Sequence, residues 1–337
     1  MDKIDFVILW VDGNDPKWKK EKEKYSNNDN NKRAVEASRF RDWENLQYWF
    51  RGVEKYANWV NKIFFVTYGH VPKWLDVSNP KIEIVKHEDF IPKEYLPTFN
   101  SNAILVNLNK IKGLSEKFVV FNDDMFLLKP VQKTDFFDKN GMPKDECVHN
   151  IITSYGVKGQ HCHFLLNNIE IINRNFRKYN VIEHNILKTF NFKYGFRVLR
   201  TIFLLPWYSF TGFYDPHIPN SYLKNSFDEV WEKEQDTLVN TSKHKFRNNE
   251  DVTEWVVRYW QLCKGKFKPR NTKKFGKYFF VTDDNKKIVE EIKKQKHKVI
   301  CINDVKDNFD FESAKKQIIE AFKSILPEKS SFEREDS

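Results

Sequence analysis

Short apolar runs that end in carboxylate or amide side chains constrain the fold of this chain more than any other feature. A short continuous apolar run is typical of a strand buried on both faces, and such strands build parallel sheets covered by helices. The C-terminal ends of these strands line the ligand crevice of an open parallel sheet. We therefore expect the polar ends of the runs to face one cleft. The runs are residues 4–11 followed by Asp12 and Gly13, residues 118–121 followed by Asn122, Asp123 and Asp124, and residues 299–303 ending in Asn303 before Asp304.

Amphipathic helices alternate with these strands. From Ser38, an apolar stripe recurs at three- and four-residue steps through Phe40, Trp43 and Leu46 to Ala57, as a helix packed on one face requires. Such alternation predicts an α/β fold with a mainly parallel, Rossmann-like sheet flanked by helices. The other expected elements are strands 63–67, 82–85 and 278–281 and helices 102–112, 221–239, 250–262, 284–294 and 311–326.

We expect one domain over residues 1–326. Its N-terminal α/β part covers residues 1–130, and residues 214–326 complete the sheet. Between them, residues 131–213 mix aromatic and basic segments and are predicted to form a variable, mostly helical or irregular insertion. Residues 327–337 are charged and predicted to fray.

Composition and net charge indicate which classes of partner the chain can bind. The chain has 337 residues, of which 40% are hydrophobic, and a formal net charge of +10, so it can bury a sizeable core and favours anionic partners. No apolar run approaches the roughly 20 residues of a membrane span. Nucleic acid is not expected as a partner, because acidic residues are interleaved throughout and no nucleic-acid-binding motif occurs.

The cysteines predict a reducing compartment. Four are widely spaced without a C-x-x-C pair, and the N-terminus does not resemble a signal peptide, so we expect a cytoplasmic protein. Cys162 lies between His161 and His163, but no second pair stands at zinc-finger spacing. We therefore interpret these three residues as buried or incidental. The cysteines are Cys147, Cys162, Cys263 and Cys301.

Asp123, Asp124 and Asp304 are the candidate metal ligands. Hard carboxylate oxygens suit Mg²⁺ or Mn²⁺, which usually bridge to phosphate oxygens of a substrate. A capping or turn pair at the surface is the alternative. Asp12 and Gly13 open a second candidate loop, where glycine lets the backbone approach a ligand, although an ordinary loop explains them equally well.

Basic residues and one histidine suggest phosphate chemistry. Arg39 and Arg41, with Asp42, begin a helix whose N–H groups and charge could hold a phosphate or form surface ion pairs. His217 lies between two prolines in a stiff loop, as a general base requires, although a single loop histidine is usually structural. Residues 243–247 could clamp a diphosphate or remain a solvated basic loop.

Taken together, these segments resemble the Stealth family, which includes bacterial capsular polysaccharide hexose-1-phosphate transferases and the catalytic α/β subunit of GlcNAc-1-phosphotransferase. The P-loop, G-x-G-x-x-G, G-x-S-x-G and H-E-x-x-H motifs of other enzyme classes are absent. Four blocks carry the resemblance. They are residues 4–16; residues 38–42, 54–57, 66–67, 71–75, 87–89, 96–101, 114–118 and 121–126; residues 215–219 with 244–252; and residues 299–304.

The resemblance implies transfer of a hexose 1-phosphate or N-acetylhexosamine 1-phosphate from a UDP-sugar to a glycan hydroxyl. The product is a phosphodiester, UMP leaves, and Mg²⁺ or Mn²⁺ assists. The implied catalytic residues are His217, Arg247, Asp123 and Asp304, with Asp124 as a further metal ligand. The implied substrate contacts come from Asp12, Gly13, Arg39, Arg41, Asp42, Thr67, Asn122, Lys243, His244 and Asn303.

Two other functions stay open at this point. A metal-dependent glycosyltransferase would move the sugar alone and release UDP, but it would not need the His217 and Arg247 blocks. A non-enzymatic basic protein could bind anionic glycan or lipid, with binding that collapses in salt. The expected acceptor is a glycan or lipid-linked oligosaccharide, and the resemblance implies that the insertion of residues 131–213 lies on the acceptor side. Peripheral contact at the inner face of the membrane stays open.

Overall fold

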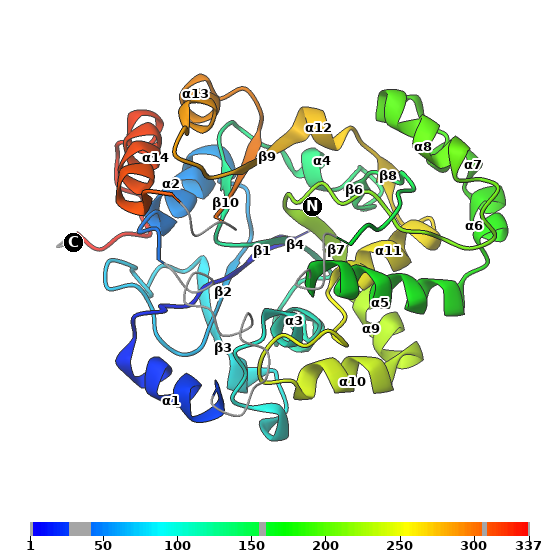
Figure 1. The fold of residues 1–337 in the computed structure, drawn as a ribbon. Coiled ribbons are helices and arrows are strands. Elements are labelled where there is room, and N and C mark those ends of the chain that lie inside the picture. Colours follow the sequence, from blue (N-terminus) through cyan, green and yellow to red (C-terminus); the bar gives the residue numbers. More distant parts are fainter. Residues whose placement is uncertain (1–2, 27–41, 155–159, 305–308, 336–337) are drawn as a thin grey trace.

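A five-stranded sheet forms the centre of the molecule (Figure 1). The computed structural model describes residues 3–26, 42–154, 160–304 and 309–335. In the sheet order β3-β2-β1-β4-β7, the first four strands are parallel and β7 is antiparallel to β4. The expected mainly parallel α/β fold is therefore confirmed. The strands are β1 (Ile4–Leu9), β2 (Ile63–Thr67), β3 (Ile82–Lys86), β4 (Lys117–Phe121) and β7 (Asn220–Leu223).

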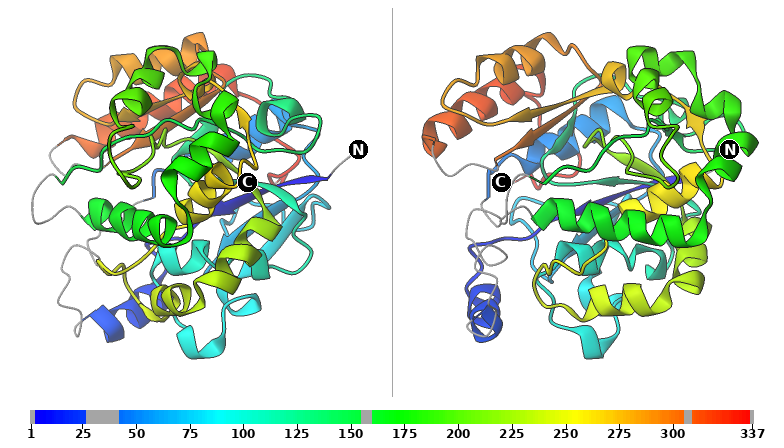
Figure 2. Two further views of the ribbon diagram at one scale, coloured as in Figure 1. Left: turned by 90° about the vertical axis from the view of Figure 1, so that its right-hand side faces the viewer. Right: turned by 45° about the vertical axis from the view of Figure 1, so that its right-hand side comes forward.

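Helices bury both faces of this sheet, as the continuous apolar runs require. Phe6 and Ile8 of β1 belong to one core, whereas Val7 between them belongs to the other. Figure 2 shows the two helical layers on either side of the strands. The first layer contains α2 (Leu46–Tyr56), α13 (Lys286–Lys294) and α14 (Phe311–Ile325), and the second contains α3 (Ser101–Leu105), α5 (Gln160–Asn175), α9 (Lys224–Lys233), α10 (Gln235–Lys243) and α11 (Trp255–Cys263).

The C-terminal strands form a sheet of their own, in the order β5-β10-β9. β5 (Met125–Leu127) is antiparallel to β10 (Val299–Asn303), which is parallel to β9 (Gly276–Phe280). The expectation that residues 214–326 complete the main sheet holds only for β7. Because β7 occupies the edge beside β4, β10 pairs instead with the short strand that directly follows β4.

The middle of the chain is mostly helical, as expected. A two-stranded sheet of β6 and β8 ties it to the C-terminal part. No helix among the described residues is long and apolar enough to cross a membrane. The elements are α4 (Lys133–Phe136), β6 (Lys144–Asp145), α6 (Lys178–His184), α7 (Ile186–Thr189), η6 (Phe192–Arg197), α8 (Val198–Phe203), β8 (Lys268–Pro269) and α12 (Thr272–Phe275).

Several helices start later than the apolar pattern predicts. The helix expected from Ser38 begins at Leu46, and residues 38–41 lie outside the described part. The helix expected from residue 221 begins at Lys224, because residues 220–223 pair with β4. The helix expected at 102–112 is split into α3 and η5 (Leu108–Lys110). The remaining short helices are α1 (Pro16–Ser26), η3 (His87–Asp89) and η4 (Lys93–Tyr95).

The C-terminal segment is folded onto α2, which contradicts the expectation of a frayed tail for its described residues, 327–335. Phe332 is only 2% exposed and its ring lies 5.4 Å from that of Phe50. Arg51 donates two hydrogen bonds to the Glu333 carboxylate, at 2.8 and 2.7 Å. One apolar anchor and one bidentate ion pair therefore dock a segment that is charged overall.

Candidate active site

Three strand ends meet at one edge of the sheet. β2 and β3 lie on one side of β1 and β4 lies on the other, so the connections diverge between β1 and β4 and leave room for a ligand there. Asp12 follows β1, and Asp123 and Asp124 follow β4. The Ile302 N–H donates to the Asp124 carbonyl at 2.9 Å, which brings the end of β10, with Asp304, to the same place.

The carboxylate of Asp124 is the centre of this site. Its Oδ2 accepts hydrogen bonds from Asn303 Nδ2 and Cys301 Sγ, each at 3.2 Å. Its Oδ1 is buried and has no hydrogen-bond partner among the described residues. A buried polar atom without a partner is costly, so Oδ1 marks a position where a ligand can bind.

His217 reaches Asp124 through the antiparallel pairing of β7 with β4. Val120 of β4 lies opposite Asn220 of β7, so the residues that precede β7 run past the end of β4. Potential ligand atoms of His217, Asp124 and Cys301 all lie within 4.8 Å of one another. The structure thus brings together a predicted base and a predicted metal ligand that are distant in sequence.

The His217 ring is held in a strained, largely desolvated position. Its backbone has φ of 49°, which is uncommon for a non-glycine residue and often found at functional sites. Trp255 and Tyr278 contact the ring edge-on, with centroid distances of 5.8 and 5.0 Å. Desolvation lowers the pKa of His217, the Asp124 carboxylate opposes this, and the positive charge of Arg247 adds to it. A neutral ring can accept a proton.

A buried arginine fixes the loop that carries His217. Arg258, 1% exposed, donates to Asp215 Oδ1 at 2.6 Å and to both oxygens of Asp145 at 2.7 and 2.9 Å. The Tyr259 hydroxyl donates to the other oxygen of Asp215 at 2.7 Å. Asp215 precedes His217 by two residues, so this cluster determines where the histidine lies.

Arg247 lies within electrostatic range of the histidine. Its Nε and Nη2 donate to Ser101 Oγ at 3.1 and 2.5 Å, which fixes the guanidinium beside α3. His161 is another neighbour, since its ring contacts Trp255 at 5.9 Å. Its pKa is lowered by desolvation and then by the charges of His217 and Arg247. The sequence interpretation of His161, Cys162 and His163 as buried or incidental agrees with the burial of Cys162, but it did not predict that His161 lies near His217 and Arg247.

The buried carboxylate of Asp251 fixes His244, which precedes Arg247 by three residues. Asp251 Oδ1 lies 2.7 Å from His244 Nδ1, and Asp251 Oδ2 accepts from Asn100 Nδ2 at 2.8 Å and Asn102 Nδ2 at 3.1 Å. These contacts tie residues 244–251 to α3. Lys243, at the end of α10, is exposed.

Negative charge accumulates around Asp123. The Asp123 side chain is open to solvent, yet desolvation by the surrounding protein and then the charges of Asp124, Asp304 and Asp42 raise its pKa to about 7. Asp304 Oδ2 accepts a hydrogen bond from Trp43 Nε1 at 3.0 Å. Three other carboxylates therefore act on Asp123 at this edge of the sheet.

The ends of β1 and β2 form the opposite wall. The Asp12 N–H donates to His70 Nε2 at 2.8 Å, and Asp12 Oδ1 accepts from the Asn14 N–H at 2.8 Å. Thr67 is fully buried, and its hydroxyl donates to the His70 carbonyl at 2.6 Å. Thr67 therefore fixes the loop after β2 from inside the protein and is not itself exposed at the site. Gly13 is buried within the turn after β1.

Asn122, Arg39 and Arg41 are the remaining residues predicted to contact the substrate. Asn122 is half-buried, and its carbonyl accepts from the Met125 N–H at 3.1 Å, so it shapes the turn that presents the two aspartates. Arg39 and Arg41 lie outside the described residues. Cys301 was not predicted as part of the site, although its spacing of two residues from Asn303 on one strand places both side chains on the same face.

Asp124 offers an oxygen ligand to a hard divalent cation. Its Oδ1 has no partner among the described residues, and carboxylate oxygens are the ligands that Mg²⁺ and Mn²⁺ prefer. Among the described residues, the side chains close enough to share one ion with Asp124 are His217 and Cys301, and the carboxylates of Asp123 and Asp304 lie outside this cluster. Burial, and then the negative charge of Asp124, raise the pKa of the Cys301 thiol well above its usual range. Cys301 therefore keeps its proton and acts as a hydrogen-bond donor, unlike a zinc-binding thiolate.

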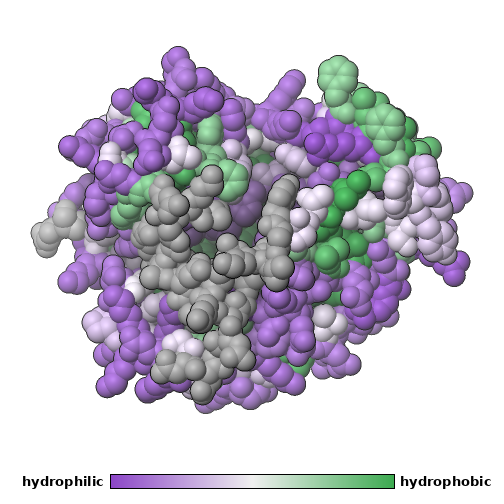
Figure 3. Space-filling model, viewed as in Figure 1, coloured by the Kyte–Doolittle hydropathy of each residue, from purple (hydrophilic) through white to green (hydrophobic). Residues whose placement is uncertain are grey.

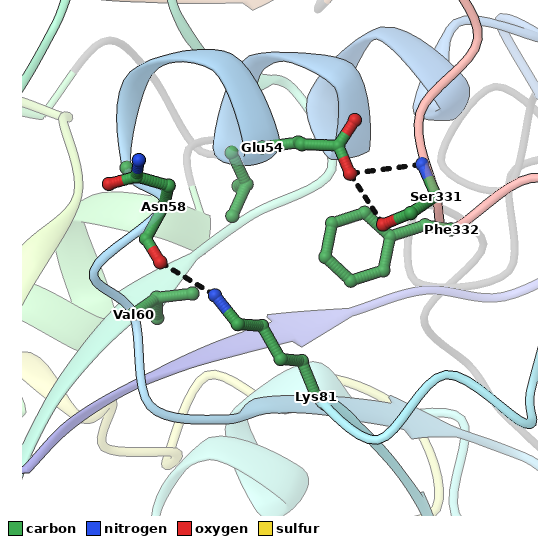
Figure 4. Close-up of a pocket in the computed structure, with 8 residues that line it drawn as sticks. Glu54, Asn58, Val60, Lys81, Ser331 and Phe332 are labelled. Atoms are coloured by element: carbon green, nitrogen blue, oxygen red, sulfur yellow. Dashed lines mark hydrogen bonds between the residues drawn. The ribbon is translucent and has the colours of Figure 1, made fainter.

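A small pocket elsewhere in the structure shares no residue with this site. It lies between the end of α2 and the C-terminal segment (Figure 4). Glu54 accepts hydrogen bonds from the backbone and hydroxyl of Ser331, and Lys81 donates to the Asn58 carbonyl at 2.6 Å. Because its polar groups are paired with one another, it offers little chemistry.

Comparison with known proteins decides the family. Conserved regions 1, 2 and 4 of Stealth proteins match residues 2–30, 39–145 and 290–337. A capsular polysaccharide phosphotransferase WcwK of Streptococcus pneumoniae is 48% identical, with 99% of each chain covered. The chain belongs to the Stealth family. An exopolysaccharide phosphotransferase, cps2G, of Lactiplantibacillus plantarum is 45% identical, with 98% of this chain and 96% of that protein covered.

The matched Stealth regions contain the aspartates of the candidate site. Region 1 contains Asp12, region 2 contains Asp123 and Asp124, and region 4 contains Asp304. His217 lies between the second and third matched ranges. Among solved structures, a galactosyltransferase LgtC covers 97% of this chain and 98% of its own, with 11% identity and a TM-score of 0.41.

Proposed function

We propose that this Stealth protein is a phosphotransferase that moves a sugar 1-phosphate from a UDP-sugar to a glycan hydroxyl. The product is a phosphodiester in a capsular or other cell-surface polysaccharide, and the leaving group is UMP. Relatives that align along almost the whole chain carry the names capsular and exopolysaccharide phosphotransferase. The observation that carries the proposal is the convergence of His217 and Asp124 at the switch point of the sheet, within the electrostatic range of Arg247.

In this proposal His217 is the general base. Its lowered pKa keeps the ring neutral near pH 7, so it can take the proton of the acceptor hydroxyl as the oxygen attacks. The acceptor oxygen forms a bond to the phosphorus that carries the sugar. The bond from that phosphorus to the bridging oxygen breaks, and its electron pair leaves with UMP.

The proposal also assigns roles to Arg247 and to three aspartates. Arg247, oriented by Ser101, would stabilise negative charge on the transferred phosphoryl oxygens. Asp123, Asp124 and Asp304 would hold Mg²⁺ or Mn²⁺, which supplies charge neutralisation to the diphosphate and to the departing UMP.

The remaining polar residues would position the substrates. Asp12, Gly13 and Asp42, at the β1 end of the crevice, would contact the nucleotide sugar, and His244 would contact its phosphates. The acceptor is a glycan or lipid-linked oligosaccharide, and the reaction takes place in the cytoplasm. The basic net charge of the chain favours the approach of the anionic nucleotide sugar.

The experiment is to identify the released nucleotide. The purified protein is incubated with a panel of UDP-sugars, Mg²⁺ or Mn²⁺ and a short glycan acceptor, and the products are separated by chromatography. UMP and a phosphodiester-linked glycan are expected. Release of UDP with transfer of the sugar alone would identify an ordinary glycosyltransferase instead, and no turnover on any donor would contradict the proposed enzyme.

A further inference from the structure

Large apolar side chains are exposed together on one part of the surface. Of the fifteen such side chains that are exposed among the described residues, ten lie between residues 179 and 208. Figure 3 shows the apolar surface at the upper right, where Figure 1 places α7 and α8. An apolar group gathered in this way marks an interaction site. We call it the aromatic face; it consists of Tyr179, Ile186, Leu187, Phe192, Phe196, Leu199, Ile202, Phe203, Trp207 and Tyr208.

The exposure of these rings is extreme. Phe192 is 86% exposed, Phe196 91% and Tyr208 84%. Phenylalanine normally contributes to a core, because each buried ring removes a large apolar area from water. Rings that protrude almost completely therefore gain stability only when another apolar phase covers them.

The backbone beneath the aromatic face is firmly attached to the protein. The Lys178 ammonium, 2% exposed, donates to the Trp207 carbonyl at 2.8 Å and also to the Leu204 carbonyl. Arg197 forms a buried ion pair with Glu146 at 2.7 Å. Buried polar contacts of this kind hold the helices in place, so the protruding side chains belong to an ordered surface.

Positive charge surrounds the aromatic face. Arg177, Lys193 and Arg200 are exposed among its apolar residues, and Glu183 is the one acidic residue in the sequence from 176 to 210. Basic residues near a membrane surface are attracted to anionic lipid headgroups. Tryptophan and tyrosine, both present here, favour the interface between headgroups and acyl chains.

The same charges disfavour a second copy of the chain as the occupant. A twofold interface would place each basic surface against its own equivalent, where like charges repel. A bilayer has no such conflict, because protruding rings can enter the acyl region while basic side chains remain among the headgroups.

We propose that the aromatic face docks this protein on an anionic lipid bilayer. The docking itself does not depend on the proposed function. Its consequence for the site does, because α8 leads through residues 204–214 to the loop that carries His217, which Arg258 fixes. Docking would thus set the orientation of the acceptor side of the site relative to the membrane.

The test is cosedimentation of the full chain with vesicles of phosphatidylcholine, with and without phosphatidylglycerol. The native protein is expected to bind the vesicles that contain phosphatidylglycerol. The triple variant Phe192→Ser, Phe196→Ser, Phe203→Ser is expected to bind at least about tenfold more weakly. The control, Tyr25→Ser with Val77→Ser, removes exposed apolar side chains elsewhere and should bind as the native protein does.

A charge variant tests the electrostatic part separately. Lys193→Glu with Arg200→Glu should weaken binding to phosphatidylglycerol vesicles, whereas Lys93→Glu with Lys139→Glu, on exposed residues outside the aromatic face, should not. The triple variant should release UMP from a UDP-sugar and a water-soluble acceptor at the native rate, so failure of docking is distinguishable from failure of the proposed activity.

Three results would overturn the docking proposal. The first is a native protein that binds neither kind of vesicle. The second is a folded triple variant, judged by circular dichroism, that binds as well as the native protein. The third is a native protein that is dimeric in lipid-free solution while the triple variant is monomeric by sedimentation, which would make the aromatic face an interface between copies.

Discussion

The ring of His217 and the carboxylate of Asp124 lie within 4.8 Å of each other, together with the thiol of Cys301. The strand that follows His217 is antiparallel to the strand that precedes Asp124, so the two side chains approach the site from opposite chain directions. Burial lowers the pKa of His217, and Asp124 keeps one oxygen without a hydrogen-bond partner among the described residues. In the proposed function, these two side chains would remove the proton and help to neutralise the phosphate side by side.

Replacing His217 by alanine should lower turnover by about 10²–10⁴, because general-base catalysis contributes on that scale. The measurement is UMP release at saturating substrates. His184→Ala, on an exposed surface residue, is the control and should retain native turnover. A folded His217→Ala protein with native turnover would remove His217 from the chemistry.

Asp124→Asn keeps the size of the side chain and removes its charge. If Asp124 binds Mg²⁺ or Mn²⁺, the metal concentration for half-maximal activity should rise by about tenfold or more. The exposed Asp228, changed to Asn, should leave the metal titration unchanged. An identical titration curve for Asp124→Asn would show that this carboxylate is not a ligand.

Arg258→Met should lower the free energy of unfolding by about 3–5 kcal/mol, because it leaves Asp145 and Asp215 buried without their counter-charge. Urea unfolding measures this. Arg174→Met breaks an ion pair with Glu234 in which Arg174 is half exposed, and it should cost about 1 kcal/mol or less. Equal stability of the two variants would mean that the buried cluster contributes no net stability.

Acid should destabilise the fold through His149. Burial, and then the charge of Lys178, lower the pKa of His149 to about 3, and the residue is 2% exposed. The unfolded chain binds a proton near pH 6.5 and the folded chain does not, so the contribution is full above pH 6.5 and declines as the pH falls toward 3.

The slope is about 1.4 kcal/mol of unfolding free energy per pH unit for one such group. Urea unfolding between pH 6 and 4 should show a shallower decline for His149→Gln than for the native protein. The exposed His184→Gln should follow the native curve. Parallel curves for His149→Gln and the native protein would refute this assignment.

The parallel strands of the main sheet could be predicted from the sequence, because they read as short continuous apolar runs, whereas the pattern assigned residues 221–223 of β7 to a helix. Residues 299–303 were predicted to within a residue. The second sheet could not be predicted, since nothing in residues 276–280 or 299–303 says which edge they pair with. The contact between Phe332 and Phe50 could not be predicted either, because one aromatic residue in a charged segment gives no periodic pattern.

The members of the candidate site could be predicted better than the residues that hold them. Aspartates at strand ends and a histidine between prolines are visible in the sequence. Arg258 and Asp251, which position His217 and His244, look like ordinary residues within or next to a helix. Their roles depend on pairing across the fold, and only residues brought together by the tertiary structure can show it.

The ion pair between Arg51 and Glu333 has a practical consequence for anyone who shortens or tags this protein. Deleting the residues after α14 would expose the apolar side chains of α2 that Phe332 covers. It would also remove the Glu333 carboxylate, which accepts two hydrogen bonds from Arg51, a side chain that is only 12% exposed. That helix, α2, packs in the same core as α13 and α14 on one face of the central sheet. An affinity tag is therefore better placed at the other terminus, where residue 3 is already exposed.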